Sequence, residues 1–111
     1  MSVKIESKND LMICFVEGEI DINSSPDIKK SFDKILSKKA PKIVINLIKV
    51  TYIDSSGLAT LVEILKNMRS YGGEMKLCNM SAKVKSLFEI TKLDKLFDIV
   101  EDENAAVSAF I

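Results

Sequence analysis

Short segments with strand character alternate with longer segments of helical periodicity along this chain, and this alternation constrains the fold more than any other sequence feature. The short segments predict strands at residues 2–7, 11–16, 42–48, 74–78 and 96–100, and residues 11–16 form a continuous apolar run. Apolar residues at helical spacing predict four helices. They are Ile28, Phe32, Ile35 and Leu36 in the first helix, Leu58, Leu61, Val62, Leu65 and Met68 in the second, and Val84, Leu87 and Phe88 in a third opened by Ser81, with residues 102–110 as the fourth. We therefore predict an α/β fold, a mixed and largely parallel sheet of about four to five strands packed with about four helices.

Several residues predict where these elements end. Ser25 before Pro26 predicts an N-cap followed by proline at the first helical position, where the missing N–H has no consequence. Pro41 disfavours helical geometry in the residue before it, so the first helix should end at residue 40. The glycine pair at residues 72 and 73 predicts a left-handed C-cap for the second helix, and residues 8–10 predict a turn between the first two strands.

Charge and length limit the classes of partner. At 111 residues the chain is predicted to form one domain over residues 1–111, large enough to bury a core without metal or disulfide support. Its 16 Lys and Arg balance its 16 Asp and Glu. A direct nucleic-acid or membrane partner is not expected, because both attract clustered positive charge. Since the amphipathic stripes leave no long apolar surface spare, we expect a monomer.

The two cysteines do not indicate a metal site or a redox motif. Cys14 and Cys78 stand alone in apolar surroundings, and the chain has no His. We predict that both are small buried hydrophobic residues, and we expect neither metal nor cofactor. No secretory signal and no apolar run of membrane-spanning length is visible, so a cytoplasmic location is expected.

The segment VTYIDSSGLATL, residues 50–61, joins the third predicted strand to the second predicted helix. Its simplest interpretation is a helix N-cap, in which the side chain of Asp54, Ser55 or Ser56 accepts a backbone N–H. Such a cap is worth about 1 kcal/mol. A cap needs one of these groups and the segment supplies three, so capping alone does not explain the pattern.

A second interpretation is catalysis by a serine nucleophile. Such a serine normally needs a base, usually His, so a Ser-His-Asp triad is excluded in this chain. The segment also lacks the first glycine of the G-x-S-x-G elbow, and no phosphate-binding glycine motif is present. A Ser-Lys hydrolase built on Ser55 stays open as the enzyme alternative.

A third interpretation is a modification site. A serine at a strand-to-helix junction is exposed to a kinase and also sits on a rigid element. Phosphorylation would add about −1.5 to −2 charge beside Asp54. The N-terminus of a helix tolerates negative charge, whereas a partner surface resting on the same loop would have to desolvate it. The pattern therefore indicates a charge switch that leaves the fold intact.

Three segments resemble the bacterial anti-sigma-factor antagonists, a family built on the STAS domain. GEIDINSS is similar to the family's G-E-[IL]-D segment, and IDSSGLATL to its D-S-[ST]-G-L phosphorylation loop. GGEMKLCNMSAKVKSLFEITKLDKLFDI is similar to the segment that follows them. The three occur in the family's order and spacing over nearly the whole chain.

The resemblance implies a STAS fold and a partner-switching mechanism. In the family, the unphosphorylated antagonist binds an anti-sigma factor and frees the sigma factor. That anti-sigma factor is also an ATP-dependent serine kinase, and a PP2C-type phosphatase reverses its action. By match to the motif, Ser55 is the phosphorylated residue, and the partner- or kinase-contact residues are Asp21, Asp54, Ser56, Gly57 and Leu58. The alternative within the family is a STAS module that scaffolds a sensor or serves a transporter.

Three positions carry open questions. Asp21 is either a turn residue before Ser25 or a fixed negative charge beside Ser55 that contacts a basic kinase surface. Ala59 stands where the family commonly has glycine, which should stiffen the helix and alter partner choice. Lys92 stands where a glycine usually ends the third helix. If that turn needs a left-handed residue, lysine costs roughly 1 to 2 kcal/mol.

Overall fold

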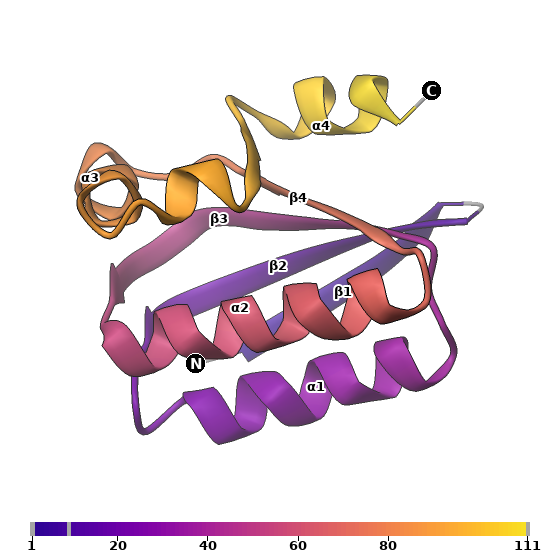
Figure 1. The fold of residues 1–111 in the computed structure, drawn as a ribbon, viewed down its shortest axis with the longest axis horizontal. Helices are drawn as coiled ribbons and strands as arrows, with labels where there is room; N and C mark the ends of the chain where they lie inside the picture. Colours follow the sequence, from indigo (N-terminus) through magenta and orange to yellow (C-terminus); the bar gives the residue numbers. More distant parts are fainter. Residues whose placement is uncertain (1, 9, 111) are drawn as a thin grey trace.

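The computed structural model describes residues 2–8 and 10–110, so the predicted turn at residues 8–10 falls partly outside the described residues, at Asn9. Five strands form one sheet in the order β1-β2-β3-β4-β5 (Figure 1). They are β1 Ser2–Lys8, β2 Leu11–Ile20, β3 Lys42–Ile53, β4 Glu74–Cys78 and β5 Asp98–Val100. Only the β1–β2 pair is antiparallel, and the other neighbouring pairs are parallel. The predicted α/β fold with a mixed, largely parallel sheet is confirmed.

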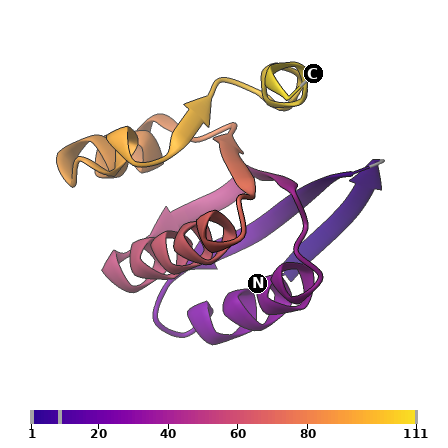
Figure 2. The same ribbon diagram turned by 45° about the vertical axis from the view of Figure 1, so that its right-hand side comes forward.

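Four α-helices in the described part of the chain pack against this sheet. They are α1 Ser25–Ser37, α2 Ser55–Ser70, α3 Ala82–Ile90 and α4 Glu103–Ala109, and a short 3-10 helix, η1, spans Leu93–Lys95. α1 and α2 lie side by side along one face of the sheet, and α4 lies against the other face (Figures 1 and 2). α3 packs where the end of β3 meets the start of α2. The ends of β2 and β3, the starts of α1 and α2, and α3 therefore meet at one end of the sheet.

Each face of the sheet has its own apolar cluster. The larger cluster joins α1, α2 and α3 to the sheet and includes Cys14, while the smaller one lies under α4 and includes Cys78. Both cysteines are fully buried, as predicted. Burial raises the pKa of each thiol to about 12, with the nearby Glu103 and Asp102 also raising that of Cys78. Both side chains thus remain neutral thiols and act as small core residues.

The start and end of α1 correct two predictions. The helix begins at Ser25, so Ser24, not Ser25, occupies the N-cap position, and Pro26 lies inside the first turn. Ser24 makes no capping hydrogen bond, because its hydroxyl accepts the backbone N–H of Asp21 at 2.9 Å instead and donates to the carbonyl oxygen of Glu19 at 2.7 Å. At the other end, α1 stops at Ser37 rather than at residue 40, and Lys39 turns the chain away with φ +54°.

β2 and β3 are longer than predicted, and β5 is shorter. The sequence indicated strands only to residues 16 and 48, but pairing continues to Ile20 and Ile53 through two register shifts. At the first shift, Asn46 Oδ1 accepts the backbone N–H of Ile48 at 3.0 Å, which satisfies a donor outside the regular ladder. β5 starts at residue 98 rather than 96, because the chain first forms the η1 turn. The extra length of β2 and β3 carries the chain to the site described below.

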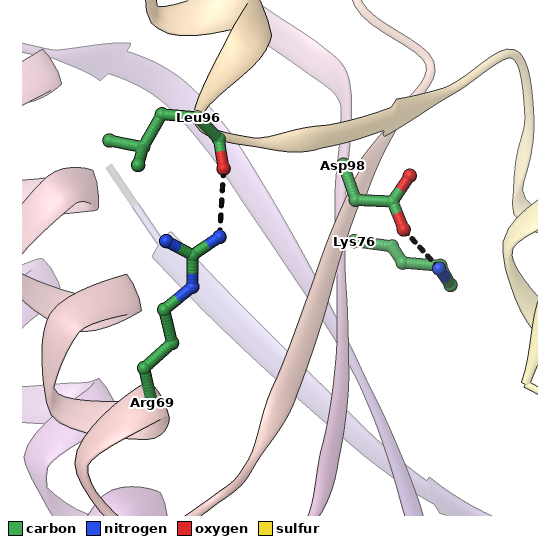
Figure 3. Close-up of polar contacts among 4 residues, drawn as sticks. All are labelled: Arg69, Lys76, Leu96 and Asp98. Atoms are coloured by element: carbon green, nitrogen blue, oxygen red, sulfur yellow. Dashed lines mark hydrogen bonds and ion pairs between the residues drawn. The ribbon is translucent and has the colours of Figure 1, made fainter.

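Long side chains tie the last strand and helix to the rest of the fold (Figure 3). Arg69 of α2 donates from Nη2 to the carbonyl oxygen of Leu96 at 3.0 Å. Lys76 of β4 forms an ion pair with Asp98 of β5. Its Nζ also lies 4.9 Å from the centre of the Phe110 ring. A lysine over an aromatic face is attracted by the ring. These contacts hold the three-residue β5 and the segment before it against β4 and α2.

Lys92 adopts the left-handed conformation (φ +62°, ψ +17°) directly before η1. Because a side chain is strained there, Lys92→Gly should raise the free energy of unfolding by about 0.5 to 1 kcal/mol after the greater freedom of glycine in the unfolded chain is allowed for. The urea midpoint should rise accordingly. Lys92→Ala is the control, since it removes the charge but keeps Cβ, and an equal gain in that variant would contradict the strain explanation.

Candidate functional site

Two loops that lie far apart in the sequence meet at the end of the sheet from which α1 and α2 start. We call residues 21–24 the Asp21 loop and residues 54–57 the Ser55 segment. β2 and β3 are parallel neighbours, and their last paired residues are Ile20 and Ile53. The residues that follow these strands therefore leave the sheet side by side. The backbone N–H of Asp54 donates to the carbonyl oxygen of Ile20 at 3.1 Å, which joins the Ser55 segment to β2.

Asp54 connects the two loops and starts α2. Its Oδ1 accepts the N–H of Gly57 at 2.8 Å, so Asp54 is the N-cap among the three capping candidates. Its Oδ2 accepts the N–H of Ile22 at 3.2 Å, across to the Asp21 loop. One carboxylate thus satisfies a donor of the helix and a donor of the neighbouring loop. The hydroxyls of Ser55 and Ser56 are not needed as caps.

Gly57 lets α2 press against the end of β2. A Cβ at this position would lie 2.3 Å from the carbonyl oxygen of Ile20 and 2.8 Å from the Cγ2 of the same residue. The backbone carbonyl cannot move aside as a flexible side chain could. The glycine in this segment is therefore required by the close approach of two main chains. It holds the first turn of α2, and Ser55 with it, at a fixed place.

Asp21 closes the turn that precedes α1. Its Oδ1 accepts the N–H groups of Asn23 and Ser24 at 2.9 and 3.0 Å. These hydrogen bonds, chiefly that from Ser24, hold the pKa of Asp21 below its usual value, so it is ionised at neutral pH. Its main-chain oxygen accepts the Ser25 hydroxyl at 2.7 Å. The side chain has the turn role considered from the sequence, and it also places a negative charge at this end of the molecule.

Ser55 is exposed at the first position of α2 and borders a groove with a cavity volume of about 430 Å³. The end of β3, the first turn of α2 and one side of α3 form its walls. Leu58, only 5 % exposed, lies in the wall, and Tyr52, 44 % exposed, stands at the surface. The lining residues are Thr51, Tyr52, Ile53, Asp54, Ser55, Leu58, Lys83, Val84, Leu87 and Thr91. An exposed serine therefore stands at the edge of a mainly apolar groove.

Two features of this site were missed by the sequence analysis. α3 contributes a wall of the groove, although its apolar stripe predicted only core residues, and Leu87 of that stripe is in fact half-buried. Ile22 is 68 % exposed on the Asp21 loop, next to the N-cap of α2. The sequence did contain a signal for the exposure of Ile22, namely a large apolar residue between the polar residues Asp21 and Asn23. No local signal could have placed α3 beside Ser55.

The other chemical possibilities at this end of the fold are few. Lys83 lines the groove with Ser55, but no lysine in the described part of the chain hydrogen-bonds to the Ser55 hydroxyl. Across residues 2–8 and 10–110, no three His, Cys, Asp or Glu side chains gather where they could hold a metal ion. None of the helices in those same ranges has the length and apolar character needed to cross a membrane. The described site thus offers a hydroxyl, carboxylates, a lysine and apolar side chains.

Comparisons of this chain with family models, curated proteins and solved structures agree with one another. The STAS domain family matches residues 2–106. An anti-sigma-B factor antagonist of Listeria monocytogenes is 36 % identical over 107 residues, which cover 94 % of this chain and 91 % of the relative. The crystal structure of Thermotoga maritima TM1081 has a TM-score of 0.91 at 30 % identity and covers 96 % of this chain and 92 % of that one.

A third comparison concerns the fold alone. The Bacillus cell fate determinant SpoIIAA in its phosphorylated form has a TM-score of 0.78 at 18 % identity, over 99 % of this chain and 100 % of that one. This likeness, over nearly the whole of both chains, concerns the architecture described above. Together with the match over residues 2–106 and the Listeria relative, these findings show that the chain belongs to the STAS domain family.

Proposed function

We propose that this protein is an anti-sigma-factor antagonist that is switched by phosphorylation of Ser55. In its unphosphorylated form it binds an anti-sigma factor, which is also a serine kinase, and the sigma factor is released. Phosphorylation of Ser55 ends this binding, and a PP2C-type phosphatase restores it. The proposal places the protein in the cytoplasm, with residues 1–111 acting as one STAS domain that has no catalytic activity of its own.

The observation that carries the proposal is the division of roles between Asp54 and Ser55. Asp54 caps α2 and holds the Asp21 loop, while Ser55 is exposed beside the groove. A phosphate on Ser55 would lie at the start of a 16-residue helix, where the dipole favours negative charge. The cap and the core would not have to change. Modification would therefore alter the surface and leave the fold intact, which is what a binding switch requires.

The surroundings of Ser55 support a protein partner. Ser55 borders the apolar groove with Leu58, and the neighbouring Asp21 loop lines a second depression, whose lining residues are Glu19, Asp21, Asn23, Ser24 and Asp27. An apolar area with an acidic flank fits a partner surface that combines apolar anchors with basic side chains. The Listeria relative is named an anti-sigma-B factor antagonist, and SpoIIAA is described in a phosphorylated form. Both descriptions agree with this proposal.

The predicted contact residues would serve this interface in different ways. Asp21 offers a negative charge beside the site, and Leu58, although only 5 % exposed, contributes an apolar side chain to the wall of the groove. Asp54 and Gly57 shape the backbone, so their part is to position Ser55. Ser56, half-buried in the first turn of α2, offers a hydroxyl next to the modified one.

Phosphorylation should be confined mainly to Ser55. After incubation with the cognate kinase and ATP, peptide mass spectrometry should find one phosphate there, and Ser55→Ala should take up almost none. The hydroxyls of Ser24 and Ser25 donate to backbone carbonyls at 2.7 Å, and Ser56 is half-buried, so all three are poorer substrates. Modification mainly at any of these three serines would overturn the assignment.

A pull-down separates this proposal from a sensor-scaffold or transporter role. Wild type and Ser55→Asp are used as baits with a purified anti-sigma factor kinase from the same organism. The proposed switch requires capture by wild type and loss of capture by Ser55→Asp. Equal capture by both baits would favour a scaffold whose binding does not depend on the charge at residue 55.

A further inference from the structure

The outer edge of β1 is open over its full length. β1 lies at one end of the sheet order, and no other strand within residues 2–8 and 10–110 pairs with its outer side. It pairs with β2 over seven consecutive residues without a bulge. All of its residues except Val3 are exposed. Edge strands that are long and regular present free backbone donors and acceptors to another strand, and this one has neither proline nor bulge to prevent it.

The side chains of β1 suit pairing with a second copy of the same strand. Its sequence is SVKIESK, in which Lys4 and Glu6 flank Ile5 symmetrically. Lys4 and Glu6 line one depression together with Phe15 of β2, so both lie on the same face of the sheet. If two such strands run antiparallel with Ile5 opposite Ile5, Lys4 of each copy faces Glu6 of the other. Opposite charges at directly opposed positions stabilise an antiparallel pair.

The charges also select this register from the neighbouring ones. In a two-fold pair that continues the sheet, opposed residues share a face, so the register can shift only in steps of two. Centring the pair on Lys4 would place two lysines opposite each other. Centring it on Glu6 would oppose two glutamates and bring Lys4 to Lys8. Of the three registers centred on Lys4, Ile5 and Glu6, only the one centred on Ile5 opposes unlike charges, and it also covers Ile5, which is 43 % exposed.

We propose that this protein self-associates through β1, forming an antiparallel pair centred on Ile5 that joins two five-stranded sheets. This inference differs from the monomer expected from the sequence, because hydropathy patterns do not report unpaired backbone at a sheet edge. Ser55 follows β3, two strands in from β1, so the pairing leaves the candidate site of both copies accessible. An interface made by one strand edge is small, so the dimer should be weak and should dissociate on dilution.

Sedimentation equilibrium of the full chain tests this proposal. At low salt, the weight-average mass should rise from 12.4 kDa towards twice that value as the concentration is raised into the high micromolar range. Lys4→Glu and Glu6→Lys should each weaken association at least tenfold, because each opposes like charges at both positions. The double variant Lys4→Glu/Glu6→Lys should associate like the wild type. Lys30→Glu, an exposed charge change on α1, is the matched control and should have no effect.

Mixing the two single variants gives the sharpest result. Positions 4 and 6 are both acidic in Lys4→Glu and both basic in Glu6→Lys, so an equimolar mixture should form heterodimers although each protein alone associates at least tenfold more weakly than the wild type. Circular dichroism checks that all variants are folded, which is expected because the substituted side chains are exposed. A wild type that stays monomeric over the whole range would overturn the proposal. So would a double variant that fails to recover, or single variants that associate like the wild type.

Discussion

Ser55→Asp should bind the anti-sigma factor more than a hundredfold more weakly than Ser55→Ala, while both variants unfold at nearly the wild-type temperature. Stability should change little because Asp54 supplies the N-cap, so the Ser55 hydroxyl is not needed for the start of α2. A carboxylate at residue 55 also lies where the helix dipole favours negative charge. The two variants thus separate binding from folding.

The expected loss of affinity comes from desolvation. A carboxylate forced against an apolar groove without a partner typically costs several kcal/mol. A loss of about 3 kcal/mol corresponds to more than a hundredfold in the dissociation constant, since each 1.4 kcal/mol is a factor of ten. Ser55→Ala should keep its affinity and resist inactivation by the kinase.

Isothermal titration with the anti-sigma factor, together with a melting curve for each variant, provides the measurement. Ser37→Asp is the matched control, because it makes the same substitution at an exposed serine where α1 ends, far from the site. It should bind like the wild type. Equal affinities for Ser55→Asp and Ser55→Ala would contradict the charge switch, and so would a loss of binding that only accompanies unfolding.

Gly57→Ala should lower the free energy of unfolding by at least about 2 kcal/mol, because the new Cβ would lie 2.3 Å from the carbonyl oxygen of Ile20. Helix propensity alone predicts the opposite sign, since alanine is favoured over glycine by about 1 kcal/mol inside a helix. The melting temperature should fall by about 8 to 15 °C. The displaced first turn should also weaken partner binding.

The control for Gly57→Ala is Ala59→Gly, at an exposed position of the same helix. It reverses the substitution without a close contact and should lose only about 1 kcal/mol, from helix propensity. Thermal unfolding of the two variants side by side separates the two effects. A Gly57→Ala variant as stable as the wild type would show that α2 can move away from β2 without loss.

The fold could be predicted wherever each element carries its own signal. β4 was placed correctly because a short segment with Met75, Leu77 and Cys78 follows directly after Gly73, and α2 because its apolar stripe ends before the two glycines. The second halves of β2 and β3 were missed because charged residues such as Glu17 and Lys49 interrupt the apolar pattern there. These second halves are extended because β2 and β3 pair with each other there, and a single sequence does not show which strands pair.

The site shows the same limit. Ser55 and its neighbours could be found from a motif, and the turn role of Asp21 from its residue type. The bond from Ile22 to Asp54 could not be predicted, since it depends on the register that pairs Ile20 with Ile53. Lys92, in contrast, could be singled out from the sequence, because it stands where the family usually has glycine. The structure shows it in the left-handed conformation, as that departure suggested.

The bridge that Asp54 makes between α2 and the Asp21 loop has a kinetic consequence. Both segments are already fixed by hydrogen bonds of 2.8 to 3.2 Å, so a docking protein has no loop to order and loses little conformational entropy on this side. Association rates should then be similar for different partners and for charge variants, apart from electrostatic steering. Their affinities should differ through the lifetime of the complex, and phosphorylation of Ser55 would act mainly by shortening that lifetime.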